Sequence, residues 1–327
     1  MKSPKSSIGG FFELESDFLL ETEQQYHQGA LSLSTGRACL HLICTKRTIK
    51  KIFVPFYTCD ALLQPLLENK IDFEFYSINK NLELAENIKL GEDEYIVYIN
   101  YFGIKTEYSN ELIEQFGEKL ILDNTQSFFT IGNSKTWSFN SARKFFGVPD
   151  GAYLYGPELS NDGLKTNPFY QCNHLLERKF GDQQRSYELF SLYERSLTAG
   201  IYKISNVANW LLNHLDMKLI RQKRRENFTC YENAFRSSNR LAAAIDVIET
   251  PFCYPLSLNT AIDKKRLHQL NIFVPTLWPD VFNRNITGFE FEKQLASNLL
   301  PLPVDHRYEK ADCEQVIQII QQIEKSL

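Results

Sequence analysis

The stretch from residue 94 to residue 124, EYIVYINYFGIKTEYSNELIEQFGEKLILDN, predicts one strand, one helix and a second strand. EYIVYINYF and KLILDN are short, apolar and rich in β-branched or aromatic residues, which is typical of buried strands. Between them, YSNELIEQFGEK has apolar residues three and four positions apart, the spacing of an amphipathic helix. Because a helical crossover usually joins parallel strands, this stretch predicts an α/β fold.

The same alternation continues on both sides of that stretch. Further strand candidates are KKIFVPFY (50–57), IDFEFYSI (71–78), KTWSFN (135–140) and GAYLYG (151–156), and helix candidates are GRACLHLICTKR (36–47) and DALLQPLLEN (60–69). We therefore expect a mostly parallel sheet flanked by helices, in a doubly wound arrangement, up to about residue 156.

The second half of the chain has a different pattern. Residues 167–239 are dominated by helical periodicity, and strand signals almost vanish there. Beyond residue 241, strand candidates return and a final helix closes the chain: AIDVIET (244–250), YPLSLN (254–259), NIFVPTLW (271–278) and ADCEQVIQIIQQIEKSL (311–327). This pattern predicts two domains, a large one over 1–240 with long connecting helices and a smaller C-terminal α+β domain over 241–327.

Composition restricts the possible partners. The 327 residues carry a formal net charge of -4, so no overall basic field attracts nucleic acid or an anionic membrane. No apolar run reaches the roughly 18 residues of a membrane helix, and the first residues lack the apolar region of a signal peptide. The seven cysteines are scattered without a CxxC pair, which favours a reducing, cytoplasmic setting.

Several common site motifs are absent from the sequence. Neither a P-loop nor a GxGxxG fingerprint occurs, so nucleotide-driven and nicotinamide chemistry lack support. The six histidines show no metal-ligand spacing, and we expect no metal site.

A candidate anion site lies in LSLSTGRACLHL, residues 31–42, where Thr35 and Gly36 precede an amphipathic helix. Exposed N–H groups and the positive end of the helix dipole favour an anion there, and a glycine lets the backbone approach a phosphate. The alternative is that these residues only cap the helix.

A second candidate is Asp123, which ends the apolar KLIL and precedes Gln126 by three residues. An aspartate at the carboxyl end of a strand lies where open α/β sheets bind ligands, and opposite a heterocyclic nitrogen it would keep that nitrogen protonated. A turn or N-cap role is the alternative.

A third candidate is Lys144 in SARKFFGVPDG (141–151), which Phe145 and Phe146 follow directly. A partly desolvated lysine can present a neutral amine that attacks a carbonyl, and Ser141 could donate to a phosphate. The alternative is an ordinary surface lysine. In INYFG (99–103), Asn100 or Tyr101 could touch a bound ring, or could simply pack.

In this order, STGRACL, VPFYTC, NYFG, LDNTQ and SARKFFGVPDG resemble the large domain of a fold-type-I pyridoxal phosphate (PLP) enzyme. More narrowly, the set is similar to the DegT/StrS (DegT/DnrJ/EryC1/StrS) family of sugar aminotransferases. The tail LPLPVDHRYEKADCEQVIQII also resembles the final segment of this family. The resemblance is strong over residues 30–156 and thin over about 160–290.

The resemblance implies a role for each matching residue. It makes Lys144 the lysine that bonds to the PLP aldehyde, Asp123 the partner of the pyridinium nitrogen and Gln126 the partner of the ring oxygen. The phosphate seat would be formed by Thr35, Gly36, Arg37 and Ala38, together with a hydroxyl from Ser138 or Ser141.

The chain departs from the family pattern at three places. Cys59 stands where an aromatic ring commonly covers the cofactor, which leaves Tyr57 or Tyr101 as substitutes. Phe139 stands where the phosphate-binding serine usually lies, five residues before the lysine. GDQQR (181–185) replaces a GYNYR-like segment and puts Gln183 at the position that reaches into the active site of a partner subunit.

The activity that the resemblance implies is transfer of an amino group from an amino acid to a keto group. By family analogy the donor is glutamate and the keto group belongs to a nucleotide-linked sugar. A homodimer with sites at the subunit interface is implied as well. The alternatives are another reaction of the lysine-bound cofactor, such as elimination or decarboxylation, or a protein that keeps the fold as a binding or regulatory module.

Overall fold

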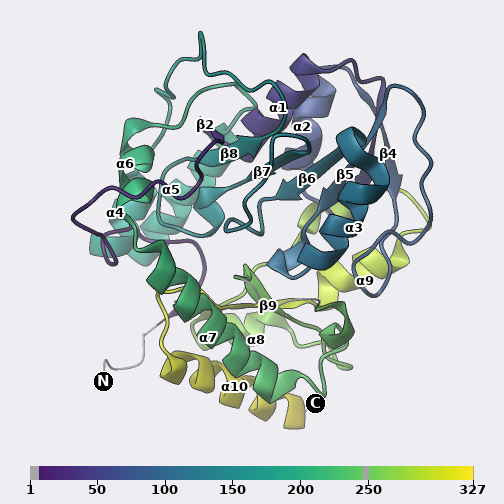
Figure 1. Ribbon diagram of the computed structural model, residues 1–327. Helices are drawn as coiled ribbons and strands as arrows, with labels where there is room; N and C mark the ends of the chain where they lie inside the picture. The colour runs from purple at the N-terminus through teal and green to yellow at the C-terminus, as the bar shows by residue number, and fades with distance from the viewer. Residues whose placement is uncertain (1–6, 246–249, 327) are drawn as a thin grey trace.

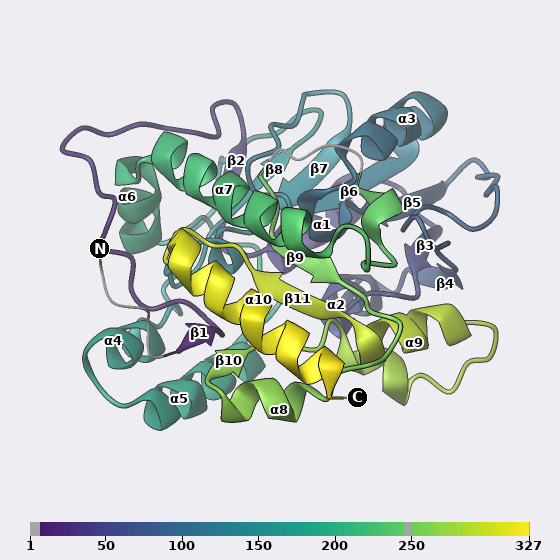
Figure 2. The same cartoon turned by 90° about the horizontal axis from the view of Figure 1, so that it is seen from below.

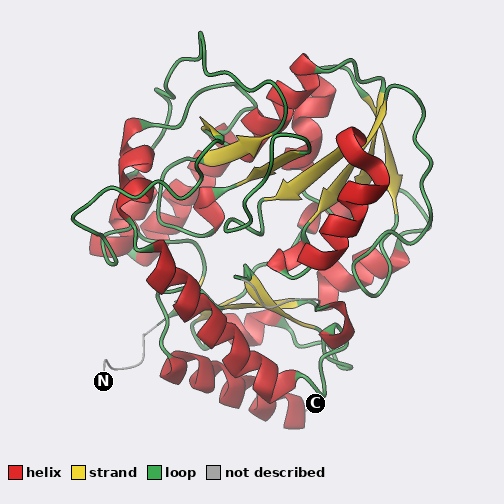
Figure 3. Ribbon diagram, viewed as in Figure 1, coloured by secondary structure: helices red, strands yellow, loops and turns green. Residues whose placement is uncertain are grey.

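A central seven-stranded sheet organises the computed structural model, which describes residues 7–245 and 250–326 (Figures 1 and 3). Its strands are β2 (Leu31–Leu33), β3 (Lys51–Pro55), β4 (Asp72–Tyr76), β5 (Glu94–Ile99), β6 (Leu120–Asn124), β7 (Trp137–Asn140) and β8 (Ala152–Tyr155). They lie in the order β2-β8-β7-β6-β5-β3-β4. β8 runs opposite to the other six strands of this sheet, so the expected mostly parallel sheet is confirmed.

Helices cover both faces of this sheet. α1 (Gly36–Lys46) and α2 (Asp60–Glu68) lie on one side and α3 (Thr106–Phe116) on the other (Figures 1 and 2). The strand order explains this arrangement. The crossover from β3 to β4 and the crossover from β5 to β6 move in opposite directions along the sheet, and right-handed crossovers then place their helices on opposite faces.

Four helices continue the chain beyond the sheet: α4 (Asn173–Phe180), α5 (Gln183–Ser196), α6 (Asn206–His214) and α7 (Met217–Phe235). Their N-caps explain where three of them begin. The side chains of Asp182, Ser205 and Asp216 each accept a hydrogen bond from a backbone N–H in the first turn of α5, α6 and α7. The helical character predicted for 167–239 is confirmed.

The C-terminal part forms a smaller layer below the sheet. Here β9 (Cys253–Leu256) pairs antiparallel with β11 (Leu300–Pro303), and α10 (Lys310–Lys325) lies beside α7 (Figure 2). The remaining elements are α8 (Lys264–Gln269), β10 (Ile272–Phe273) and α9 (Glu290–Asn298). A domain division at residue 240 stays a prediction, and α7, which precedes it, packs on α10, which follows it.

The sequence pattern did not predict two of the strands, and a third prediction includes residues that the structure does not describe. β2 is too short to give a periodic signal, and β11 is the sequence LPLP, whose prolines disfavour a strand prediction. The candidate strand 244–250 includes residues 246–249, which lie outside the described residues. In the described ranges, no helix is long and apolar enough to cross a membrane.

The N-terminal segment 7–30 joins the two layers. β1 (Ile8–Gly9) pairs with β10 of the C-terminal layer, and Arg307 donates to Glu13 over 2.9 Å. The same segment meets the loop after Lys144, because Glu15 N donates to Gly147 O over 2.9 Å. The lysine loop is therefore held from outside the sheet.

We predict that Gly147→Ala destabilises the protein by about 2–4 kcal/mol, because an added Cβ would lie 1.6 Å from the backbone oxygen of Glu13 and the N-terminal segment would have to move. Urea unfolding measures the loss. Gly91→Ala is the control, since its Cβ meets only the side chain of Glu94, and we expect a change within about 0.5 kcal/mol. Equal stability of Gly147→Ala and wild type would contradict the tight contact.

Candidate active site

A cavity of about 1460 Å³ opens at the carboxyl edge of the central sheet. Its wall combines the residues after β2, β3, β6 and β7 with α5 and with segments 9–12 and 273–276. In open α/β sheets the crevice beyond the carboxyl ends of the strands is where ligands bind. The sequence-predicted residues that line this wall are Thr35, Gly36, Arg37, Cys59, Asp123, Ser141, Lys144 and Gln183.

The first turn of α1 forms one side of the cavity. Thr35 is the N-cap, and its Oγ1 accepts from the N–H of Ala38 over 3.1 Å. The N–H groups of Gly36 and Arg37 belong to the same turn, where an α-helix offers no internal acceptors. This end of α1 is therefore capped, which was the alternative to an anion site in the sequence analysis. Its remaining N–H groups are also able to receive an anion.

Arg37 adds a full positive charge to this side. Its Nε is buried and has no hydrogen-bond partner within the described residues. Burial lowers the pKa of Arg37, while the nearby carboxylate of Glu194 acts to raise it. Glu194 is ion-paired with Arg143, so two guanidinium groups share one carboxylate and positive charge remains at this wall.

Asp123 and Lys144 meet beside the first turn of α1 through Thr125. Lys144 is the last residue of a 3-10 turn, Ala142–Lys144, and its Nζ donates to Thr125 Oγ1 over 2.9 Å. Thr125 N donates to Asp123 Oδ1 over 2.8 Å. Burial raises the pKa of Asp123, whereas the charge of Lys144 and hydrogen bonds from Thr125 act to lower it.

Cys59 and Ser141 complete this side of the cavity. Cys59 is the N-cap of α2 and is half-buried, and burial raises the pKa of its thiol, so the thiol is neutral at physiological pH. Ser141 lines the cavity, whereas Ser138 is 3% exposed and its hydroxyl faces Gly132. Of the two serines that the sequence left open, only Ser141 is at the wall.

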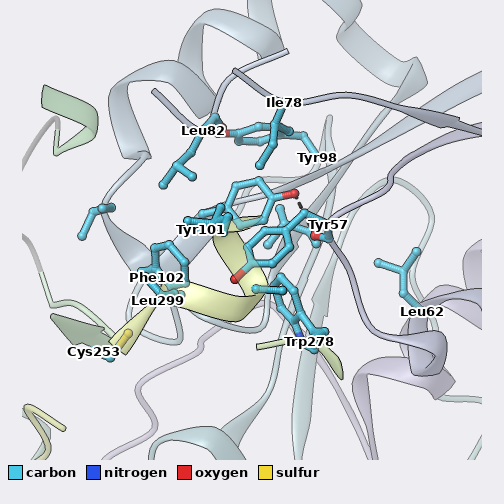
Figure 4. Close-up of a cluster of buried hydrophobic side chains, with 14 of the residues drawn as sticks. Tyr57, Leu62, Ile78, Leu82, Tyr98, Tyr101, Phe102, Cys253, Trp278 and Leu299 are labelled. Atoms are coloured by element: carbon cyan, nitrogen blue, oxygen red, sulfur yellow. Dashed lines mark hydrogen bonds between the residues drawn. The ribbon is translucent and has the colours of Figure 1, made fainter. Parts of the chain in front are cut away.

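Tyr57 and Tyr101 lie in the apolar core and not at the cavity wall (Figure 4). Their rings are 5.7 Å apart, and Tyr101 donates its hydroxyl hydrogen to the backbone oxygen of Tyr57 over 3.0 Å. Trp278 packs edge-on against Tyr57 at 4.9 Å and is itself part of the wall. Trp278, unlike Tyr57 and Tyr101, is thus one of the aromatic residues that line the cavity.

Gln126 and Ala38 are fully buried behind the wall. Gln126 Oε1 accepts from Phe102 N over 2.8 Å, while its Nε2 has no partner in the described part of the chain. The roles predicted for these two residues in binding a cofactor stay predictions.

Among the cavity-lining residues that sequence reasoning missed are Thr125, Arg143, Glu194 and Trp278. Thr125 lies inside the LDNTQ motif, so its position was visible, but its contact with Lys144 was not. Glu194 and Trp278 are distant in sequence from every motif, and no local signal marks them. Gln183, predicted to reach a partner subunit, lines the cavity of its own chain.

No family model and no curated protein matches this sequence. Solved structures do match it in three dimensions. PseC of Helicobacter pylori, an aminotransferase involved in the biosynthesis of pseudoaminic acid, is 14% identical over 100% of both chains, with a TM-score of 0.65. Spr1654 of Streptococcus pneumoniae, in its PLP-form, is 13% identical over 98% of this chain and 100% of that chain, with a TM-score of 0.67.

A DegT DnrJ EryC1 StrS aminotransferase from Brucella abortus is 14% identical over 90% of this chain and 85% of that chain, with a TM-score of 0.60. At such low identity these similarities establish the fold. The predicted fold class, that of the fold-type-I PLP enzymes with a mostly parallel sheet flanked by helices, is confirmed.

We predict that Arg37→Gln weakens the binding of inorganic phosphate about tenfold or more, because a charge-assisted hydrogen bond to the anion is lost. Isothermal titration of the full chain with phosphate measures the change. Arg185→Gln is the control, since that side chain is 71% exposed and belongs to α5. Equal phosphate affinity of Arg37→Gln and wild type would rule Arg37 out of an anion site.

Proposed function

We propose that this chain, which has the fold of the aminotransferases named above, is itself a PLP-dependent aminotransferase. The observation that carries the proposal is that one cavity collects a lysine amine, a buried strand-end carboxylate and a helix N-terminus beside a guanidinium whose buried Nε has no hydrogen-bond partner among the described residues. A cofactor with an aldehyde, a ring nitrogen and a phosphate needs one of each.

The residues at the wall fit that cofactor. Arg37 Nε is a buried donor that has no acceptor in the described ranges, and a phosphate oxygen would supply one. Gly36 leaves open the space that a Cβ would fill, 3.2 Å from Thr125 Cγ2. We assign the phosphate to the first turn of α1 with Arg37 and Ser141, the ring nitrogen to Asp123 and the aldehyde to Lys144.

PLP supplies an electron sink that makes a proton on the α-carbon of an amino acid easier to remove. The Asp123 carboxylate would hold the ring nitrogen protonated through its opposite charge. Lys144 Nζ would take the proton from the α-carbon of the donor as a general base and return it as a general acid. The neutral Cys59 thiol and Trp278 would border the bound ring and restrict water.

For the substrates, we propose glutamate as the amino donor and a keto group on a nucleotide-linked sugar as the acceptor. The names of the neighbours support a sugar, since PseC acts in the biosynthesis of pseudoaminic acid. The cavity volume, about 1460 Å³, leaves room for a large acceptor beyond the cofactor. Arg178 also lines the cavity, where it is paired with Glu13, and is the guanidinium that we assign to a diphosphate.

We further propose a homodimer in the cytoplasm. Exposed apolar side chains gather on the α4–α5 hairpin, where Phe180 is 76% and Leu192 is 57% exposed, and such patches favour an interface. Tyr187 and Gln183 of α5 also line the cavity, so a subunit that covered α5 would border the site. All seven cysteines are free, which suits a reducing compartment.

We predict that the full chain mixed with PLP turns yellow and that borohydride then fixes the cofactor on Lys144. Absorption spectra and peptide mass spectrometry measure this, and Lys144→Ala should abolish both signals because Lys144 is the one lysine among the described residues that line the wall. Adding glutamate to the yellow protein should shift the absorbance to that of the pyridoxamine form.

Each outcome distinguishes one alternative. Absence of any PLP spectrum in wild type would contradict the cofactor assignment and leave a binding or regulatory module. A normal PLP spectrum without conversion by any amino acid would contradict the aminotransferase activity and leave elimination or decarboxylation.

We also predict that the double variant Phe180→Asp with Leu192→Asp sediments as a monomer where the wild type sediments as a dimer, because two charges would be buried in an apolar interface. Leu67→Asp, on α2 and 63% exposed, is the control and should leave the dimer intact. A monomeric wild type at micromolar concentration would contradict the dimer.

A further inference from the structure

Thr125 connects three parts of the cavity wall. It is 9% exposed, lies two residues after Asp123 and contacts both that residue and Lys144. It is also the neighbour that a Cβ on Gly36 would meet, with Cγ2 at 3.2 Å. The phosphate side of the cavity and the lysine side thus share this one residue.

A hydrogen bond and a packing contact restrict the conformation of Thr125. Its backbone N–H is bonded to Asp123 Oδ1 over 2.8 Å, and its methyl group occupies the space beside Gly36. A β-branched side chain has few favourable χ1 rotamers, so a placed methyl group also places the hydroxyl. In this conformation the hydroxyl oxygen lies 2.9 Å from Lys144 Nζ, which donates to it.

The hydroxyl is the hydrogen-bond acceptor recorded for the Lys144 amine in the described part of the chain, at 2.9 Å from Nζ. The Thr125 side chain also acts to lower the pKa of the Asp123 carboxylate. A hydroxyl can accept from an amine with one lone pair while it donates its own hydrogen to a carboxylate. Thr125 can in this way link the amine to the carboxylate without a direct ion pair.

We propose that Thr125 is a positioning residue that holds the free amino group of Lys144 and opposes its bonding to an aldehyde. This role for Thr125 rests on the proposed function, since the aldehyde that Lys144 would meet is that of PLP. Holding the free amine favours the stages of the reaction in which Lys144 must act as a base.

The chemistry sets the direction of the effect. When an amine joins an aldehyde, a carbon–nitrogen double bond forms, the carbonyl oxygen leaves as water, and the nitrogen loses two hydrogens to that water. The nitrogen that donated to Thr125 then keeps at most one hydrogen. Because the hydrogen bond stabilises the free amine more than the bonded lysine, its removal favours bonding, by about fivefold for one ordinary hydrogen bond.

The test compares wild type with Thr125→Val, which is nearly isosteric and lacks the hydroxyl, and with Thr125→Ser, which keeps it. The full chains are stripped of any PLP with hydroxylamine and treated briefly with formaldehyde and cyanoborohydride, which reduces the new double bond. Peptide mass spectrometry then gives the methylation rate of each lysine. Lys264, which donates to Pro275 O and to Thr276 Oγ1, is the internal reference in the same digest.

We expect Lys144 to be methylated about fivefold faster in Thr125→Val, with Thr125→Ser close to wild type and Lys264 unchanged. Thr125→Ala, which also lacks the hydroxyl, should be faster too, and it replaces the valine variant if that protein does not fold. Equal Lys144 rates in wild type and the variants without the hydroxyl would overturn the inference, as would an equal acceleration in Thr125→Ser.

A second measurement separates this inference from the proposed function. Titration with PLP, followed by borohydride trapping, should give a dissociation constant about fivefold lower for Thr125→Val than for wild type. If the formaldehyde rates change as expected but no variant traps PLP, the role of Thr125 stands and the proposed cofactor fails. If wild type traps PLP but Thr125→Val has the same affinity and the same formaldehyde rate, the cofactor stands and the role of Thr125 fails.

Discussion

The register between β6 and β7 is the constraint on which the rest of the site depends. Asp123 is paired with Phe139 and Asn124 with Asn140, so the two strands end at the same level. Thr125 and Ser141, which directly follow these strands, therefore both line the cavity. The turn Ala142–Lys144 then brings the lysine amine back toward Asp123. A shift of this register by one residue would turn each of these side chains to the other face of the sheet.

Buried charge is the main energetic difficulty of this arrangement. Taking a carboxylate or a guanidinium out of water is costly unless each finds a partner. Asp123 has the N–H of Thr125 and the nearby charge of Lys144, and Arg143 has Glu194. Arg37 is less fully compensated, since it shares the charge of Glu194 with Arg143 and its buried Nε has no hydrogen-bond partner in the described residues.

The cavity belongs to both layers of the protein, and long-range contacts keep them together. Arg224 of α7 donates to the backbone oxygen of Phe145, directly after the lysine, over 3.3 Å. On the same loop, Gly147 packs against the N-terminal segment, whose strand β1 is part of the C-terminal layer. The position of Lys144 therefore depends on residues near both ends of the chain as well as on the sheet.

The sequence by itself determined the elements and the order of the motifs. Apolar periodicity predicted six strands of the central sheet and its first three helices, because these signals are local. It also singled out Asp123 and Lys144, since a carboxylate after an apolar strand and a lysine before two phenylalanines are visible in a few residues. The tertiary structure alone decided which neighbours these residues have. The positions of Glu194, Trp278 and Ser141 at the cavity wall, and of Ser138 away from it, depend on strand pairing and on contacts between distant segments, which no short window of sequence contains. The bond from Lys144 to Thr125 is of the same kind, because it requires the register of two strands to be fixed first.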